Sequence, residues 1–558
     1  MSRRTLGRGA LGAFALAAFA LGYWRLYYGV DFTDEAWYVA VPYRFVLGGR
    51  PYVDELSVPQ TTTAVVLYPF VWAYHALAGR TGIVLFVRQL HFLIATAVGV
   101  AVGVSLRRVA GLGIATLAGV AAFAFVPFDI PSVSYDSLGS GLFTAGSLLG
   151  FLALSRPRAR LSAGICLGFA AFAYPPLVLA VSASCVLRLL LLRRGWRGEA
   201  IGVTLPALAI PVLGFGALVA LAGLHQVVSD YRRSSRFLGQ AGGVTKLHLI
   251  ATHLGATTFP LWYLAAAGLA LLALSWARGW GRIAALLVVA LPLTVLPPRL
   301  TTFSTSLDFV AHVGFVALPL LGGLWRRREA VELFVAVWVP ALLAGLLTSY
   351  SSANGGVNFG VGFFPAVIVT LVFSAWSIDE LVATRLPFEL APALIVATLL
   401  LYVGIVPVYR DAGLSTLHAR VTAGPYAGLF TNRAKRSFLG RLGRDLAGVN
   451  AGCTIAFFDD FPAGYLLTPA RPDTNAVWTA TVPRRLTFAY HQDLVRYYAR
   501  HGFPDVVVLM RRIPFALPRS ARRERYKAAD PLIVAIRSHG YRRSARRIDY
   551  VVYRRSTC

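Results

Sequence analysis

The stretch YYGVDFTDEAWYVAVPYRFVLGGRPYVDEL, residues 27–56, directly follows the first hydrophobic segment of the chain. It contains Asp31, Asp34, Glu35, Asp54 and Glu55, although the whole chain has only 25 acidic residues against 54 basic ones. Five carboxylates gathered beside a hydrophobic segment need an explanation. That explanation depends on the kind of protein that carries the stretch and on the side of a membrane where it lies.

The composition is that of a membrane protein. Of the 558 residues, 57% are hydrophobic and 14% are charged, and the mean hydropathy is +0.62. A soluble domain has about a quarter charged residues, so this chain is too apolar to be one. Runs such as 94–104 and 390–408 belong to segments of about 20 apolar residues, the length that crosses a bilayer. We therefore predict an α-helical polytopic membrane protein, and its arginine- and alanine-rich composition suggests a bacterial source.

Arginine clusters predict the topology. Clusters at 107–108, 156–160, 193–197, 278–282 and 326–328 are assigned to the cytoplasm by the positive-inside rule. We read the basic N-terminus and its apolar run as an uncleaved first span rather than a signal peptide, which gives about thirteen transmembrane helices with the N-terminus in the cytoplasm. A crossing at 61–78 would invert every later loop, so that segment is expected to lie partly embedded or re-entrant on the external side. The other predicted spans are 82–106, 111–128, 136–154, 161–173, 175–193, 200–223, 256–277, 283–300, 308–325, 331–350, 362–384 and 388–407.

The composition of the chain changes near residue 409, after the last predicted span. Residues 1–409 form the transmembrane domain, with a first external loop at 30–60, and residues 410–558 form a soluble extracytoplasmic α/β domain. This tail has 26 Lys/Arg and 10 Asp/Glu. CTIAFFDD, PDVVVLM and IDYVVYRR are short apolar runs that predict strands, while FAYHQDLVRYYARHG predicts a helix closed by Gly502.

Charge and cysteines limit the partners of the tail. The net charge of +29 has no nucleic-acid-binding motif beside it and is explained in part by cytoplasmic loops, so we expect no nucleic acid. The basic tail suits an acceptor, an anionic glycan or anionic lipid headgroups, and equally a solvated surface with no binding role. A bridge between Cys453 and Cys558 is compatible with the sequence, but their spacing does not indicate one.

The opening stretch predicts a helix and a turn. Aromatic and aliphatic residues from Asp34 to Phe45 are spaced as in an amphipathic helix lying at the membrane interface. Asp34 would stand near its N-terminus, where backbone N–H groups stabilise a carboxylate. Gly48 and Gly49 then turn the chain, so the two acidic doublets are expected to converge beside one cavity.

The same stretch resembles the first external loop of the GT-C superfamily of membrane glycosyltransferases, especially the branch of protein O-mannosyltransferases and lipid A aminoarabinose transferases. In that group an Asp-Glu pair opens the loop and a G-x-PY-x-D segment closes it; here these are Asp34-Glu35 and the segment 49–54 with Tyr52 and Asp54. FDIPSVSYDSLG resembles the second external loop of the family, with Tyr135 and Asp136 at the head of the next span. Asp136 or Ser134 would equally serve as a helix N-cap. Tyr174 stands where the family often has lysine, which leaves the role of that position open.

The resemblance implies transfer of a sugar from a polyprenyl-phosphate donor to a hydroxyl of a cell-envelope glycan, lipid or protein, at the outer face of the bacterial plasma membrane. Such a reaction needs a base for the acceptor's proton and groups that stabilise the leaving phosphate. Asp34 is the predicted base, with Glu35 or Asp54 orienting the acceptor. The candidates for phosphate contact are Arg232, Arg233, Lys246 and Arg299, each of which would equally anchor lipid headgroups. Arg88 is a further candidate, because an arginine early in an apolar span is costly to place without a partner. Asn354 and Asn358 belong to the glycine-rich loop 348–365, of a kind that such enzymes place near the lipid headgroup.

Three further points stay open at the sequence level. The chain has no distinct cluster of metal ligands, so we expect no obligatory metal, although some members of the superfamily bind a divalent ion. A secondary transporter is the main alternative, because Tyr174-Pro175-Pro176 would suit a broken helix, but the two halves show no repeat symmetry. A lipid-linked glycan ligase or polymerase and a non-catalytic scaffold with the same fold are the others.

Overall fold

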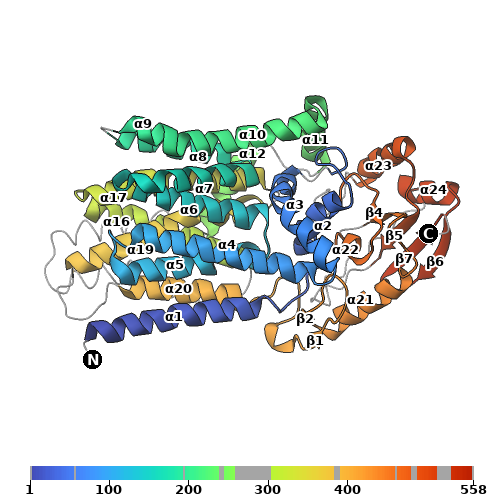
Figure 1. Cartoon of the computed structure of the whole chain (residues 1–558), viewed down its shortest axis with the longest axis horizontal. Coiled ribbons are helices and arrows are strands. Elements are labelled where there is room, and N and C mark those ends of the chain that lie inside the picture. The colour runs from blue at the N-terminus through green and yellow to red at the C-terminus, as the bar shows by residue number, and fades with distance from the viewer. Residues whose placement is uncertain are drawn as a thin grey trace.

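The computed structural model places a helical bundle at one end of the molecule and the tail at the other (Figure 1). The N-terminus lies at the end of the bundle that is far from the tail. The residues that the structure describes are 3–55, 58–192, 195–237, 244–257, 303–352, 354–381, 390–458, 461–478, 487–511, 529–555 and 558.

The bundle confirms the multi-pass prediction. Six described helical segments are long and apolar enough to cross a membrane, and shorter apolar helices lie among them: Ile83–Leu106, Tyr135–Ser155, Trp196–Ala222, Leu307–Leu324, Arg328–Ser351 and Gly355–Asp379, with Gly111–Ala124, Leu177–Leu191 and Ala391–Ile405. The predicted spans 256–277 and 283–300 lie outside the described residues. The helices of the bundle are α1 (Arg3–Arg25), α4 (Ile83–Leu106), α5 (Gly111–Ala124), α6 (Tyr135–Ser155), α7 (Arg160–Ala173), α8 (Leu177–Leu191), α9 (Trp196–Glu199), α10 (Leu205–Ala222), α15 (Phe303–Phe315), α16 (Ala317–Leu324), α17 (Arg328–Leu333), α18 (Val339–Ser351), α19 (Phe359–Leu381) and α20 (Ala391–Ile405).

Small residues let these helices approach closely. A Cβ on Gly99 of α4 would stand 2.7 Å from the carbonyl oxygen of Gly119 of α5, and a Cβ on Gly119 would stand 2.7 Å from the oxygen of Gly99. The two glycines therefore allow the backbones of α4 and α5 to touch. Such close van der Waals packing drives the association of helices in lipid, where the hydrophobic effect between helices is absent.

Helices α2 (Asp34–Val46) and α3 (Val58–Ala78) lie between the bundle and the tail (Figure 1). Residues Glu35 to Phe45 of α2 are all buried, so the expectation that this helix lies at the membrane interface is wrong. It is covered on every side because α3 and α4 pack against it from the bundle and α22 (Gly464–Leu467) packs against it from the tail. Helix α3 is not among the six described segments suited to crossing, and its partly embedded or re-entrant position stays a prediction.

The tail contains a five-stranded mixed sheet in the order β4-β3-β5-β7-β6. Strand β3 pairs in parallel with β4 and β5, and β7 pairs antiparallel with β5 and β6. The predicted strands and the predicted helix, which ends before Gly502 at φ +93°, are confirmed. The elements are β1 (Ala419–Arg420), β2 (Phe430–Thr431), α21 (Arg433–Asp445), β3 (Thr454–Phe458), β4 (Arg471–Pro472), α23 (Thr487–His501), β5 (Val506–Met510), α24 (Pro531–Ser538), β6 (Arg542–Arg546) and β7 (Tyr550–Arg554).

Two kinds of contact hold the tail. Backbone hydrogen bonds join Phe430 of β2 to the end of the first helix, from Phe430 N to the oxygen of Tyr27 (2.7 Å) and from Gly29 N to the oxygen of Phe430 (2.8 Å). Within the tail, Cys453 and Cys558 form a disulfide, which the sequence left open. Disulfides persist in oxidising compartments, so this bridge agrees with the predicted extracytoplasmic position.

Candidate active site

Asp31 starts the helix that carries the acidic pair. Its carboxylate accepts hydrogen bonds from the backbone N–H of Thr33 (3.1 Å) and Glu35 (2.8 Å) and from the hydroxyl of Thr33 (2.6 Å). Thr33 precedes α2 but makes no side-chain cap of its own. Asp31 thus satisfies N–H groups that the first turn leaves without helical partners, and it acts as a capping residue of α2.

Asp34 is held through one of its two carboxylate oxygens. Its Oδ2 accepts hydrogen bonds from the hydroxyls of Tyr409 (2.8 Å) and Thr33 (3.2 Å), and it lies 2.8 Å from Nη1 of Arg410. The hydrogen bonds to this carboxylate from described residues all reach Oδ2. The other oxygen, Oδ1, is therefore left for a substrate, and the side chain is 17% exposed.

Burial dominates the protonation of Asp34. Desolvation raises the pKa of this carboxyl above its usual value, and nearby Asp31 raises it further, while Arg410 and the hydrogen bonds from Tyr409 and Thr33 oppose the shift. A carboxylate with a raised pKa is a stronger proton acceptor. Asp34 therefore combines an open oxygen with increased basicity, as a general base requires.

Asp136 lies in the same group of side chains. Asp34 is among the charges that act on it, so the two carboxylates are electrostatic neighbours. Asp136 is 2% exposed, and its Oδ1 has no hydrogen-bond partner within the described residues. The helix does not need it as a cap, because Ser134 and Ser137 form a capping box at the start of α6. Of the two capping candidates in the sequence Ser134 takes that role, which leaves the buried carboxylate of Asp136 available to a ligand.

Aromatic rings line this group. Tyr135 makes edge contacts with Trp37, Tyr38 and Tyr174, at centroid distances of 6.0, 6.1 and 5.0 Å. The pKa of Tyr38 is raised well above its usual value by burial and then by the charge of Asp136 and Asp34. These phenols therefore stay protonated and can donate hydrogen bonds to an anion or a sugar hydroxyl.

Glu35 faces away from Asp34 and forms a buried ion pair. Arg88 donates to both of its oxygens, from Nε (2.6 Å) and Nη2 (2.7 Å), and the pair is almost completely buried. The remaining donors of Arg88 reach the backbone oxygens of Leu26, Tyr28 and Gly29. All five N–H groups of the guanidinium are thereby occupied. The structure therefore pairs the predicted site residues Glu35 and Arg88 with each other, and neither of them faces a space that could hold a substrate.

The second acidic doublet divides in the same way. Asp54 accepts a hydrogen bond from the backbone N–H of Arg50 (2.8 Å) on the surface. Glu55 is buried, lies 3.0 Å from Nη1 of Arg44 and accepts from the N–H of Val477 (3.2 Å). Glu55, which had no predicted role, joins α2 to the tail, and the doublets do not converge on one cavity.

The other predicted contact residues are dispersed. Tyr52 is fully buried at φ +60°, with its ring stacked on Tyr231. Arg233 pairs with Asp493 of the tail at 2.5 Å, while Arg232 is exposed. Lys246 is buried with its Nζ 5.5 Å from the ring centroid of Tyr350, and burial lowers its pKa to about 8.

The two asparagines of the loop 348–365 differ in burial. Asn354 is exposed in a turn, whereas Asn358 is fully buried and lies in contact with Tyr174. Asn358 therefore belongs with the ring wall around Asp136, and Asn354 does not. Arg299 lies outside the described residues.

Sequence reasoning missed Tyr409 and Arg410, which hold Asp34 from 375 residues away. In the sequence these two residues show only that the last span ends there. In the structure, Arg410 has a positive φ of +49°. Asp129 was also missed: it is buried between α5 and α6 at φ +58°, and burial raises its pKa to about 7. A left-handed conformation at a non-glycine residue is uncommon and often accompanies a functional site.

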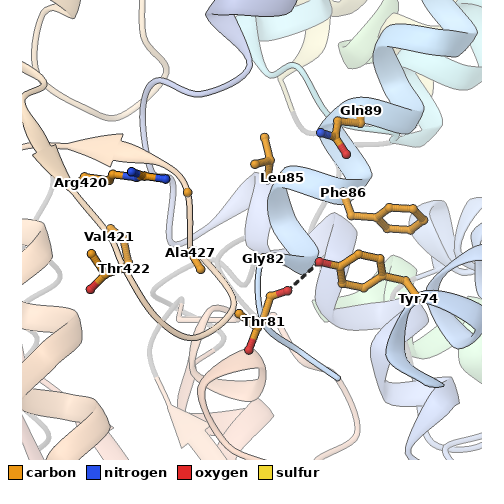
Figure 2. A pocket seen from close by; sticks show the side chains of 11 residues that line it. Tyr74, Thr81, Gly82, Leu85, Phe86, Gln89, Arg420, Val421, Thr422 and Ala427 are labelled. Carbon is orange, nitrogen blue, oxygen red and sulfur yellow. Dashed lines mark hydrogen bonds between the residues drawn. The ribbon is translucent and has the colours of Figure 1, made fainter. Parts of the chain in front are cut away.

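A separate cavity of about 560 Å³ lies where the tail meets α3 and α4 (Figure 2). Aromatic rings of Tyr74 and Phe86 form one side, and Arg420 and Thr422 of the tail lie opposite. Tyr74 donates to the carbonyl oxygen of Thr81 at 2.6 Å. The cavity does not include Asp34 or Asp136, so it is not part of the acidic group.

The described residues contain no group of three or more His, Cys, Asp or Glu side chains that could hold a metal ion. Asp34 and Asp136 would give two carboxylates to a divalent ion, with Arg410 opposing a further positive charge. Metal independence stays a prediction.

Comparisons with known proteins give two glycosyltransferases of similar structure. No family model and no curated protein matches the sequence. ArnT from Cupriavidus metallidurans, bound to undecaprenyl phosphate, is 15% identical with a TM-score of 0.43, over 98% of this chain and 97% of its own. The Archaeoglobus fulgidus oligosaccharyltransferase, in complex with Zn and sulfate, is 12% identical with a TM-score of 0.47, over 89% of this chain and 67% of its own. At this level of similarity, residue roles rest on the geometry of this chain alone.

Proposed function

We propose that this chain is a membrane glycosyltransferase that moves a hexosyl or pentosyl group from a polyprenyl-phosphate donor to an acceptor hydroxyl on the outer face of the bacterial plasma membrane. One observation carries the proposal: Asp34 has a raised pKa and an Oδ1 unoccupied by described residues, and its charge acts on the buried carboxylate of Asp136. Asp34 pairs with Arg410 through Oδ2 only, and Asp136 has no ion pair within the described residues, so each carboxylate keeps one oxygen that can accept a hydrogen bond from a sugar hydroxyl.

The proposed reaction is a direct displacement. Oδ1 of Asp34 takes the proton of the acceptor hydroxyl while that oxygen forms a bond to the anomeric carbon of the donor sugar. The bond between the anomeric carbon and the phosphate oxygen breaks, and the electron pair leaves with the polyprenyl phosphate. Asp136 and the tyrosine hydroxyls would orient the sugar by hydrogen bonds.

Cations near the site would stabilise the leaving phosphate. Arg410 lies against Asp34 and its side chain is 36% exposed, so a phosphate can approach its guanidinium, and arginine is suited to bidentate contact with phosphate. Lys246, with a pKa of about 8, is largely charged at neutral pH. We assign the first contact to Arg410 because it shares the acidic group, whereas Lys246 lies against Tyr350.

Asp34→Asn tests the proposal. The amide cannot accept the proton, so transfer from a radiolabelled polyprenyl-phosphate sugar in membranes is expected to fall about 10²- to 10⁴-fold. Asp54→Asn is the matched control, because Asp54 belongs to the same loop but lies on the surface. If Asp34→Asn is expressed normally and transfers sugar at the full rate, Asp34 is not the base. If membranes show no sugar transfer but accumulate a transported solute, the transporter alternative is favoured.

A further inference from the structure

The outer face of α21 carries arginines that the site at Asp34 does not use. Arg433, Arg436, Arg441 and Arg444, with Ser437 and Gly440 between them, line an open cavity of about 670 Å³. We call this surface the α21 groove. All six residues lie within one helix of 13 residues, so their positions are fixed by the helical repeat.

Most of this charge is not neutralised by the protein. Arg441 lies 3.0 Å from Asp549, whereas the ion pairs of the described residues include none with Arg433 or Arg436. Arg433 and Arg436, and likewise Arg441 and Arg444, stand three residues apart, where like charges on a helix repel each other. An anionic ligand would remove that repulsion.

The opposite face of the same helix supports the loop that carries Asp34. Lys435 is 1% exposed, donates to the backbone oxygens of Val30 and Arg410, and lies 3.7 Å from Asp411. The groove is therefore separated from the proposed catalytic loop by the width of one helix, about 10 Å.

The spacing of the charges favours an extended ligand. The two arginine pairs are eight residues apart along the helix, which corresponds to about 12 Å at 1.5 Å per residue. Gly440 lies between them and leaves the floor bare.

We propose that the α21 groove binds an anionic saccharide chain, recognised through its carboxylate or phosphate groups, as the acceptor of the transfer. The role of the bound saccharide as the acceptor rests on the function proposed above. Binding of the saccharide to the groove does not depend on that function. Arginine is suited to bidentate contact with both kinds of anion.

A bilayer surface fits the groove less well than a saccharide. Figure 1 shows α21 leading obliquely away from the end of the bundle, so its arginines lie at different heights above the membrane. The exposed residues of α21 include no large apolar side chain. Membrane-surface helices normally present such side chains together with their basic residues.

Binding by the full chain in nanodiscs of zwitterionic lipid tests the proposal. The probes are an oligogalacturonate of defined length, a neutral oligosaccharide of the same length, and vesicles that contain phosphatidylglycerol. We expect salt-sensitive binding of the oligogalacturonate and none of the neutral chain. Arg436→Glu should weaken that binding at least tenfold, and Arg542→Glu, a charge reversal on the exposed strand β6, should change it less than twofold.

Two glycines give a test that does not alter charge. A Cβ at Gly440 would meet only Arg444, at 3.8 Å, and a Cβ at Gly443 would meet nothing within 4 Å, so leucine fits the fold at both positions. Gly440→Leu fills the groove and should weaken oligogalacturonate binding several-fold with no loss of thermal stability. Gly443→Leu, outside the groove, should leave binding unchanged.

The outcomes separate the alternatives. Equal losses for Arg436→Glu and Arg542→Glu, or unchanged binding in Gly440→Leu, would overturn the groove as the site. Vesicle binding that depends on Arg436, without oligogalacturonate binding, would overturn the saccharide in favour of lipid. Asp34→Asn should retain oligogalacturonate binding, so a failure of the catalytic proposal would leave this one standing.

Discussion

Glu35 and Asp34 are adjacent in the sequence, yet the structure predicts opposite results for their amide variants. In Glu35→Gln the guanidinium of Arg88 keeps its charge but loses the carboxylate that it contacts at 2.6 and 2.7 Å. Both side chains are at most 3% exposed, so no water compensates for the loss. Removing one partner of a buried pair costs about 3–5 kcal/mol. The predicted effect is on stability.

Asp34→Asn should have no such cost. The pKa of Asp34 is raised in the folded protein, so its contribution to stability is fully present below the pKa of the unfolded chain and is lost as the pH rises through the folded pKa. Folding therefore disfavours the ionised carboxylate relative to the unfolded chain, and a neutral amide removes that disadvantage. Stability should stay equal or increase.

The assay is thermal unfolding of purified variants in detergent, combined with sugar transfer per folded molecule at low temperature. Glu35→Gln should lower the apparent Tm by on the order of 10 °C and retain measurable transfer. The double variant Glu35→Gln/Arg88→Met should recover part of the loss, because it no longer buries an unpaired charge. If Glu35→Gln abolished transfer at unchanged Tm, Glu35 would be catalytic and the structural interpretation of the pair would be refuted.

Three further predictions concern other contacts. Arg410 lowers the pKa of Asp34, so Arg410→Met should raise that pKa further and move the acid limb of the pH–rate profile to higher pH. Arg410→Lys keeps the positive charge and should largely restore the profile. If the acid limb does not move in Arg410→Met, a group other than Asp34 titrates there. Glu55→Gln leaves Arg44 buried without its carboxylate and should loosen the tail, measured as faster proteolysis of residues 410–558 in intact membranes, whereas Asp54→Asn should not. Replacing both Cys453 and Cys558 by serine removes the disulfide and should destabilise the tail by about 2–5 kcal/mol. In the unaltered protein, maleimide should label these two cysteines in membranes only after reduction. Labelling without reduction would place the tail in a reducing compartment.

The helices of the bundle and the strands of the tail were predictable because each follows from a local pattern. Spans need about 20 apolar residues, and a buried strand such as β5 is a short apolar run between turn residues. The location of α2 was not predictable in this way. Its pattern suits an interface, but what covers a helix depends on segments hundreds of residues away, here the tail elements around Thr474 and Val477.

The candidate site was predicted only in part, for the same physical reason. Asp34 and Asp136 stand in short motifs at the heads of helices, which a sequence displays. Tyr409 and Arg410 have no motif, and they reach Asp34 only because the last span ends beside the first loop. The partition of the acidic residues between ion pairs and an open position depends on buried arginines, and sequence spacing contains no information on which arginine reaches which carboxylate.

The five acidic residues beside the first helix therefore have different roles, and their number follows from the position of the loop. A loop between a helical bundle and a folded domain must be held from both sides, and most of its polar groups are buried. Asp31 satisfies the helix start, Glu35 holds α2 to α4 through Arg88, and Glu55 holds it to the tail through Arg44. Asp54 closes a surface turn. Each of these four carboxylates is committed to a contact that the fold requires. Asp34 has a raised pKa and keeps Oδ1 without a described partner, so the other acids create the rigid surroundings in which this carboxylate can remain reactive.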